Sequence, residues 1–182
     1  MITLRLCKTG VAALVLLASS CVFAQVNSAA GTDVTVNATL QESLTVSLDA
    51  LTVSIPLTAG SAINPGLTAI NATTNWSLAS GRTAVALYTY FDTPVALVNG
   101  AASIANTQFS AKVNGGAALP FTAIVPFGAA YAVQVFNQAI TAANRIGVNT
   151  SAVTLNIDLS AFPLLPPGTY SGTLHFRAQA TP

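Results

Sequence analysis

Apolar and polar residues alternate along most of the chain, beginning near residue 33. Over residues 33–48 the even positions are mostly apolar and the odd positions are mostly polar. This two-residue period is typical of a strand that buries one of its faces. A run of this length exceeds an ordinary strand, and Gln41-Glu42 interrupts the apolar series. We therefore predict two consecutive strands, at 33–40 and 43–48.

Short alternating runs separated by turn residues continue to the end of the chain. After residue 48 the apolar residues move from even to odd positions, and the alternation resumes over 51–55. The segment 142–150 is rich in turn residues and predicts a loop, and the one segment that could form a short helix is 138–145. The run 83–92 is apolar on both faces, which predicts a central strand. The other predicted strands are 68–79, 107–113, 118–125, 131–136, 153–160 and a final strand containing Tyr170, Leu174 and Phe176.

A tight turn is predicted at Asn114-Gly115-Gly116, which lies between two alternating runs. Asn-Gly in this position is the strongest short-range signal of a β-hairpin. It predicts that the strands on either side pair antiparallel. A second Asn-Gly, at Asn99-Gly100, is followed by a loosely patterned stretch in which no strand is predicted.

Many short strands without helical periodicity indicate an all-β fold, either a sandwich or a barrel. The chain shows no linker and no internal repeat after its first 24 residues, so a single domain over 25–182 is predicted. One core between two sheets should hold the apolar residues that alternate inward. The predicted core residues are Leu44, Val46, Trp76, Leu78, Phe109, Leu155, Ile157, Leu174 and Phe176.

Residues 1–24 have the order of a cleaved secretory signal peptide. Arg5 and Lys8 precede an apolar run, and Ala24 is the small residue that signal peptidase requires. The alternative is a lipoprotein signal at Cys21, although the aliphatic residue that such a signal needs stands one place too early. The apolar run is too short to span a bilayer comfortably. We expect an exported chain, in the periplasm, at the cell surface or outside the cell, without a transmembrane segment.

The low charge of the chain limits the classes of protein to which it can belong. Charged residues make up 6% of the sequence, against about 25% in an average globular domain. Without Arg5 and Lys8, four basic residues remain against five acidic ones, and they are widely scattered. No basic patch is formed, so we predict no nucleic-acid partner. An uncharged polar surface suits an ordinary secreted β-domain, and it also suits a subunit that is buried in an assembly.

Catalytic and metal chemistry find little support in the sequence. Both cysteines, Cys7 and Cys21, lie in the predicted signal peptide, so the mature chain has no disulfide and no thiolate ligand. His175 is the one histidine and is expected on the surface; a serine triad would need Asp158 as its acid. The carboxylates lack the spacing of a metal site. We predict no catalytic residue, no metal, no cofactor and no enzymatic activity.

A few residues are candidates for binding or for the control of assembly. Tyr88 and Tyr90 share one face of a predicted strand and could stack against a sugar ring. Trp76 lies on the same face of its predicted strand as Leu78, so it is expected in the core instead. Glu42 stands on an apolar position, which indicates a strand break or bulge. The alternative is a charge that limits aggregation of an alternating edge.

The segment 166–174, Pro-Pro-Gly-Thr-Tyr-Ser-Gly-Thr-Leu, resembles the closing strand of bacterial immunoglobulin-like surface domains. In particular, it is similar to the Pro-x-Gly-Thr-Tyr segment of spore coat U-like and archaic chaperone–usher pilin subunits. Unlike many spore coat U-like domains, this chain has no cysteine pair near its first strands. The resemblance implies an immunoglobulin-like antiparallel β-sandwich whose N-terminal strand is donated to a neighbour. The candidate donor positions are Val34, Val36, Ala38 and Leu40.

Two functions from different classes follow from these features. The first is a structural or adhesive protein of the cell surface, a pilin-like subunit whose partners are copies of itself and a periplasmic chaperone. The alternative is a monomeric carbohydrate-binding module whose partner is a surface glycan. A strand-donating subunit should polymerise or be unstable alone, whereas a binding module should be a soluble monomer that sediments with an insoluble glycan.

Overall fold

The structure, a computed structural model, describes residues 35–122 and 131–182. The chain divides into two units, Met1–Ala38 and Thr39–Pro182, and every strand described below belongs to the second unit. The predicted signal peptide lies outside the described residues, as does the end of the predicted strand 118–125.

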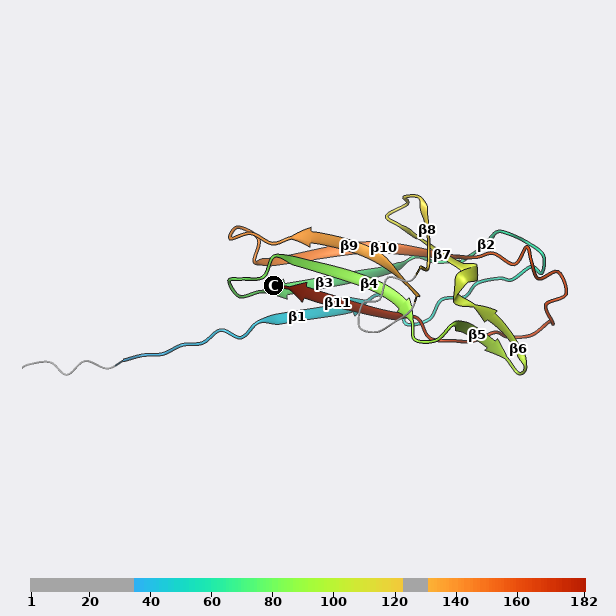
Figure 1. Ribbon diagram of the computed structural model, residues 1–182, viewed down its shortest axis with the longest axis horizontal. Coiled ribbons are helices and arrows are strands. Elements are labelled where there is room, and N and C mark those ends of the chain that lie inside the picture. The colour runs from blue at the N-terminus through green and yellow to red at the C-terminus, as the bar shows by residue number, and fades with distance from the viewer. Residues whose placement is uncertain (1–34, 123–130) are drawn as a thin grey trace, which may run out of the picture. The chain divides into compact units, whose positions relative to one another are not determined.

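The larger sheet has six strands, and all its pairings are antiparallel. Five of them lie side by side in the order β1 (Ser43–Leu48), β3 (Ile70–Ser77), β10 (Ile146–Ile157), β7 (Phe109–Val113) and β8 (Ala118–Pro120) (Figure 1). The short β2 (Asn64–Pro65) pairs with the C-terminal end of β10. Along β1 and β3 the more buried residues alternate with the more exposed ones, as the sequence pattern predicts.

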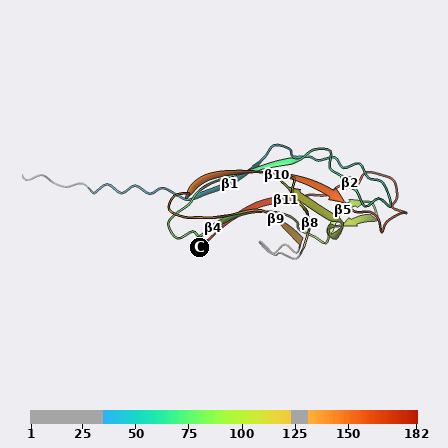
Figure 2. The ribbon, with the colours of Figure 1, turned by 90° about the horizontal axis from the view of Figure 1, so that it is seen from above.

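The smaller sheet has three strands, in the order β11 (His175–Thr181), β4 (Ala84–Phe91) and β9 (Tyr131–Ala139). Strand β4 is central and largely buried, which confirms the prediction of a central strand. A separate hairpin of β5 (Val95–Asn99) and β6 (Ala102–Ala105) follows β4, and then a short 3-10 helix, η1 (Asn106–Gln108). Figure 2 shows the two larger sheets as two layers, one over the other. The described part of the chain is therefore all β, without an α-helix.

The apolar side chains between the layers form two main clusters instead of the single predicted core. Of the predicted core residues, the buried ones are Trp76, Leu78, Phe109, Leu155 and Ile157. The half-buried ones are Leu44, Val46, Leu174 and Phe176. Ala72 belongs to the larger cluster, whereas Trp76 belongs to the smaller one. Between them on the same face of β3 lies the buried hydroxyl-bearing Thr74, and this polar residue separates the two clusters.

Strand β10 begins earlier than the sequence predicts. It starts at Ile146, so much of the predicted loop 142–150 is strand. Pairing with β3 from Ile146 to Val153 satisfies the backbone groups that face β3 and holds this turn-rich segment extended. No helix forms at 138–145, because β9 continues to Ala139 and turns follow it.

Two other predicted strands are shorter or lacking, and one hairpin was not predicted. The final strand begins at His175, and the described residues 35–42 are not assigned to a strand. Strand structure needs a partner for its backbone groups, and among the described residues no strand pairs with 35–42. The hairpin of β5 and β6 turns at Asn99-Gly100, with Gly100 at a φ of 58°. Its flanking runs are too short for their alternation to be recognised.

Trp76 lies in the core as predicted, and it covers the backbone of the neighbouring strand. Its side chain is buried, and its Nε1 donates a hydrogen bond to the carbonyl oxygen of Asn144 at 3.0 Å. In the register of β3 and β10, Trp76 lies opposite Gly147. A Cβ atom at residue 147 would lie 2.4 Å from Cζ2 of the indole. Close packing of the ring therefore requires glycine at this position.

We predict that Gly147→Ala lowers the free energy of unfolding by about 1–3 kcal/mol, because an added methyl in a packed core forces the ring or the strand to move. Urea unfolding measures the loss. In a Trp76→Leu background the same substitution should cost much less, since the two residues are coupled through contact. Equal losses in the two backgrounds would show that the indole is not the obstacle.

The predicted hairpin at Asn114-Gly115-Gly116 is confirmed. Asn114 and Gly115 have φ values of 51° and 73°, and the Gly116 N–H donates to the Val113 carbonyl at 2.9 Å. Two successive positive φ values are typical of a type I′ turn, which matches the twist of a two-stranded ribbon. Strands β7 and β8 pair antiparallel across it.

We predict that Gly115→Val destabilises the domain by about 1 kcal/mol or more, because a β-branched residue is strained at positive φ. Gly115→Asn is the matched control, since asparagine tolerates the left-handed region. Thermal unfolding should rank wild type and Gly115→Asn together, well above Gly115→Val. A Gly115→Val chain with an unchanged midpoint would contradict the turn assignment.

Candidate functional site: an open apolar groove

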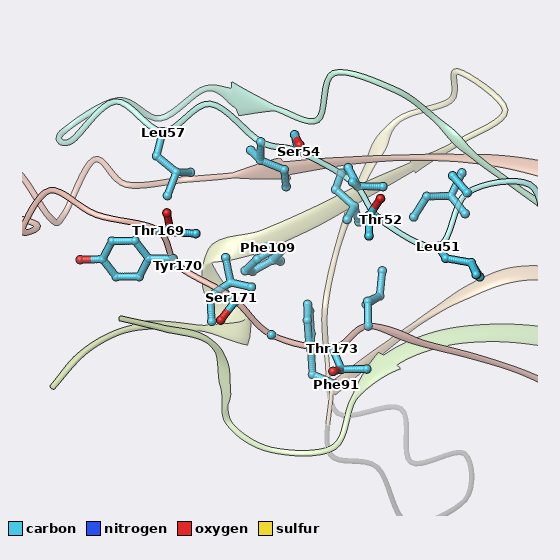
Figure 3. Close-up of a pocket in the computed structure, with 18 of the residues that line it drawn as sticks. Leu51, Thr52, Ser54, Leu57, Phe91, Phe109, Thr169, Tyr170, Ser171 and Thr173 are labelled. Carbon is cyan, nitrogen blue, oxygen red and sulfur yellow. The ribbon is translucent and has the colours of Figure 1, made fainter. Parts of the chain in front are cut away.

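A groove of about 700 Å³ opens into the larger apolar cluster. One wall is residues 48–57, from the last residue of β1 along the extended segment that follows it. The other wall is residues 168–176, the segment before β11 together with the first two residues of that strand. Figure 3 shows Leu51, Thr52, Ser54 and Leu57 along the first wall and Thr169 to Thr173 along the second. The ring of Phe109 lies between the two walls.

The first wall has the side-chain alternation of a strand, but after Leu48 it is not part of a sheet. Val53, Ile55 and Leu57 are half-buried against the core, whereas Thr52 and Ser54 are exposed. The Ser54 carbonyl accepts a hydrogen bond from the Leu67 N–H at 3.0 Å. The predicted alternation over 51–55 is therefore present without a neighbouring strand across the groove.

Among the described residues, the part of the second wall before β11 pairs with a strand on one of its sides only, that of β5. Ser171 exchanges two backbone hydrogen bonds with Val98 of β5, at 2.9 and 3.0 Å. A Cβ atom at Gly172 would lie 1.8 Å from the Ala96 carbonyl oxygen, so glycine permits this close approach. In the described part of the chain, no sheet joins this wall to residues 48–57.

The floor of the groove is made of core side chains. Phe91 and Phe109 meet edge to face with ring centroids 4.9 Å apart, and Leu155 is buried beside them. Leu174 and Phe176, predicted as core residues, are only half-buried because they line this opening. No charged side chain is among the described lining residues. The groove is therefore suited to apolar side chains on an extended backbone, and it offers little for acid–base chemistry.

The four candidate donor positions precede β1. Val34 lies outside the described residues. Val36 and Leu40 expose 84% and 85% of their surfaces, and Ala38 is also exposed. The three described candidate positions are therefore exposed.

Glu42 has a specific partner, which the sequence did not indicate. Its carboxylate accepts hydrogen bonds from the Ala79 N–H at 2.8 Å and from Arg82 Nε at 3.1 Å, and it forms an ion pair with the Arg82 guanidinium at 2.8 Å. These donors, Arg82 first, lower the pKa of Glu42 from 4.5 to about 2. Glu42 thus links the start of β1 to the turn after β3. Its charge is paired with that of Arg82.

We predict that Glu42→Gln lowers the midpoint of thermal unfolding near neutral pH. A carboxyl whose pKa is lowered by folding adds stability above its unfolded pKa, and this stability is lost as the pH falls through the folded value of about 2. The difference between the variant and wild type should therefore disappear in strong acid. Identical midpoints near neutral pH would show that the ion pair is fully screened.

The aromatic candidates lie on the outer face of the smaller sheet. Tyr90 is buried, and His175 stacks on its ring at a centroid distance of 5.3 Å. Tyr88 is half-buried and accepts a hydrogen bond from Gln134 Nε2 at 3.3 Å. Tyr88 is therefore the more accessible of the two, and sugar stacking by this pair stays a prediction.

His175 pairs with Asp92 and not with Asp158, the acid that a serine triad would need. Its Nε2 lies 2.8 Å from Asp92 Oδ2, and both side chains are partly exposed. Asp158 instead accepts a hydrogen bond from the Ser160 N–H at 2.9 Å. A triad through Asp158 is therefore not formed.

Other features of the described residues add no second site. Within 35–122 and 131–182, no three His, Cys, Asp or Glu side chains gather closely enough to hold a metal ion. No helix in these ranges has the length and apolar character needed to span a membrane.

No protein-family model matches the chain, and no curated protein matches it in sequence. The groove is the feature with the clearest functional geometry, and sequence reasoning missed it because its walls look like ordinary strands.

Proposed function

We propose that this protein is an exported structural subunit with an immunoglobulin-like, pilin-like sandwich that assembles by β-strand addition. The first strand of one copy, residues 33–40, enters the groove of the next copy. The observation that carries the proposal is an apolar groove whose two extended walls are not joined by a sheet in the described residues. β-Strand addition supplies both missing components, a backbone to pair with and side chains to fill the core.

The chemistry of the donor segment matches the groove. Its apolar side chains recur at every second position, so all four candidates lie on one face of an extended strand. The groove is lined mainly by aliphatic and aromatic side chains, with serine and threonine residues along its walls and no charged residue. Fully burying each valine or leucine side chain contributes about 1.5–3 kcal/mol. Asp33, its first residue, is the one charge of the segment, so insertion of residues 34–40 would desolvate no charge.

The chain's own first strand is a poor occupant of its own groove. A fold-back at Gln41-Glu42 would place residue 35 opposite Leu48, and thus only residues 33–35 would reach the groove wall. Segment 26–32, which lacks regular apolar alternation, would have to fill the remainder. Gln-Glu also lacks the residues that primed turns require, and Glu42 is already bound to Arg82. A second copy therefore fits the groove better.

Export and protection of the groove complete the proposal. The N-terminal signal directs the chain out of the cytoplasm, and cleavage after Ala24 leaves the donor segment close to the new N-terminus. An unfilled apolar groove would promote aggregation, so a periplasmic chaperone would cover it before assembly. The assembled polymer would serve a structural or adhesive role at the cell surface.

We predict that Val36→Asp abolishes growth into polymers, because it would place a charge in an apolar groove. Thr35→Asp is the matched control, since it adds the same charge on the opposite face of the donor strand. Electron microscopy and sedimentation at high concentration should show polymers for wild type and Thr35→Asp only. Equal assembly of both variants would refute strand donation.

Two further chains separate donation from self-completion of the sandwich. A chain lacking residues 25–40 should remain folded and lose polymerisation; if it unfolds, the segment completes its own domain. An Ile55→Asp chain keeps its donor segment but has a blocked groove, so mixing it with Val36→Asp chains should give donor–acceptor pairs that cannot grow by further strand donation. A full-length protein that stays monomeric, and whose sedimentation with insoluble glycan is lost on Tyr88→Ala, would instead support the carbohydrate-binding alternative.

A further inference from the structure

A second edge, unpaired among the described residues, is the outer side of the first half of β10. Strand β7 pairs with β10 only from Val153 to Ile157, so in the described residues the first half of β10 has a partner on one side only, β3. In the larger sheet, β3 separates this edge from β1 and from the groove wall that follows β1. Pairing at this edge would therefore be independent of strand donation.

The direction of the backbone groups on this edge follows from two observed hydrogen bonds. The Arg145 carbonyl accepts from the Leu78 N–H at 2.9 Å, so the groups of residue 145 face β3. The Ala152 carbonyl accepts from the Asn114 N–H at 2.8 Å, on the other side. Backbone groups along an antiparallel strand alternate in direction. Ile146, Val148 and Thr150 consequently point their N–H and C=O groups away from β3, toward the open edge.

The side chains at these positions are also open to solvent. Ile146 and Val148 expose 75% and 63% of their surfaces, and Thr150 is exposed as well. The polar Asn149 and Ser151 face inward and are joined by a hydrogen bond of 2.8 Å. This half-strand therefore reverses the usual pattern, with apolar residues outward and polar residues inward. Residues 146–152 contain no charge and no proline, the usual devices that protect an edge from pairing.

We propose that this edge pairs antiparallel with the same edge of a second copy, about a two-fold axis at Val148. In this register Val148 faces its own copy and Ile146 faces Thr150, so each outward-pointing residue exchanges both backbone hydrogen bonds with its partner. The β-branched side chains then form favourable cross-strand pairs. Arg145 falls opposite Ser151 of the second copy, so the two guanidinium groups are not opposed. The larger sheets of two copies become one continuous sheet.

A disulfide at the proposed two-fold axis tests this register. In a full chain whose Cys7 and Cys21 are replaced by serine, Val148→Cys brings two thiols together. A hydrogen-bonded antiparallel pair separates its Cα atoms by about 5.5 Å, which is within the range of a disulfide. With oxidised glutathione the covalent dimer should become the main species. Thr45→Cys, also exposed on the outer face of the same sheet, is the control and should give a minor fraction. Equal cross-linking at both positions, or none at 148, would overturn the proposal.

A charge at the same position provides a second test that needs no cysteine. Val148→Lys would set two ammonium groups against each other at the axis, which opposes pairing. In the Val36→Asp chain, which cannot donate its strand, sedimentation should show dimers that Val148→Lys converts to monomers and Thr45→Lys leaves intact. A monomeric Val36→Asp chain at high concentration would overturn the pairing of β10 edges. Strand donation would be unaffected by that result, because it is tested by the loss of polymers.

Discussion

The structure depends on one constraint: a sandwich must pair its edge strands and cover its core, and the described part of this one is open between the end of β1 and the start of β11. The walls of the opening, residues 48–57 and 168–176, are extended and carry the side chains of strands. Without a strand between them, neither wall becomes sheet over its whole length. β11 starts late, at His175, beside this opening, and Leu174 and Phe176 are partly exposed because they line it.

Three of the charged residues, Glu42, Arg82 and Asp92, join segments that are distant in the sequence. Glu42 binds Arg82 and the Ala79 backbone at the entry to β1, and His175 binds Asp92 at the entry to β11. The groove has no charged lining residue, and the open half of β10 carries none either. Such surfaces generate no repulsion between copies, and burying them desolvates no charge. Low charge is therefore consistent with a chain that buries two separate surfaces on assembly.

The strands that the sequence predicted best are those with long alternation or a strong turn signal. Strand β3 and the hairpin of β7 and β8 have these signals, and both formed where expected. The sequence predicts a loop over the first half of β10, because Asn144, Gly147 and Asn149 are residue types common in turns. Pairing with β3 overrides that local preference, and Gly147 is present because the indole of Trp76 occupies the space of a side chain. The sequence placed Trp76 in the core correctly but could not reveal what it packs against.

The sequence by itself determined the all-β class and the inward face of most strands, because a two-residue period is a local property that needs no knowledge of partners. It also contained both walls of the groove, as the alternation at 51–55 and the segment 166–174. Only the tertiary structure decided which strands are neighbours, since β3 and β10 pair across a long stretch of intervening chain. It likewise decided that the two walls face each other without a sheet between them. Alternation shows that a segment can pair, but the presence of a partner is a property of the whole fold.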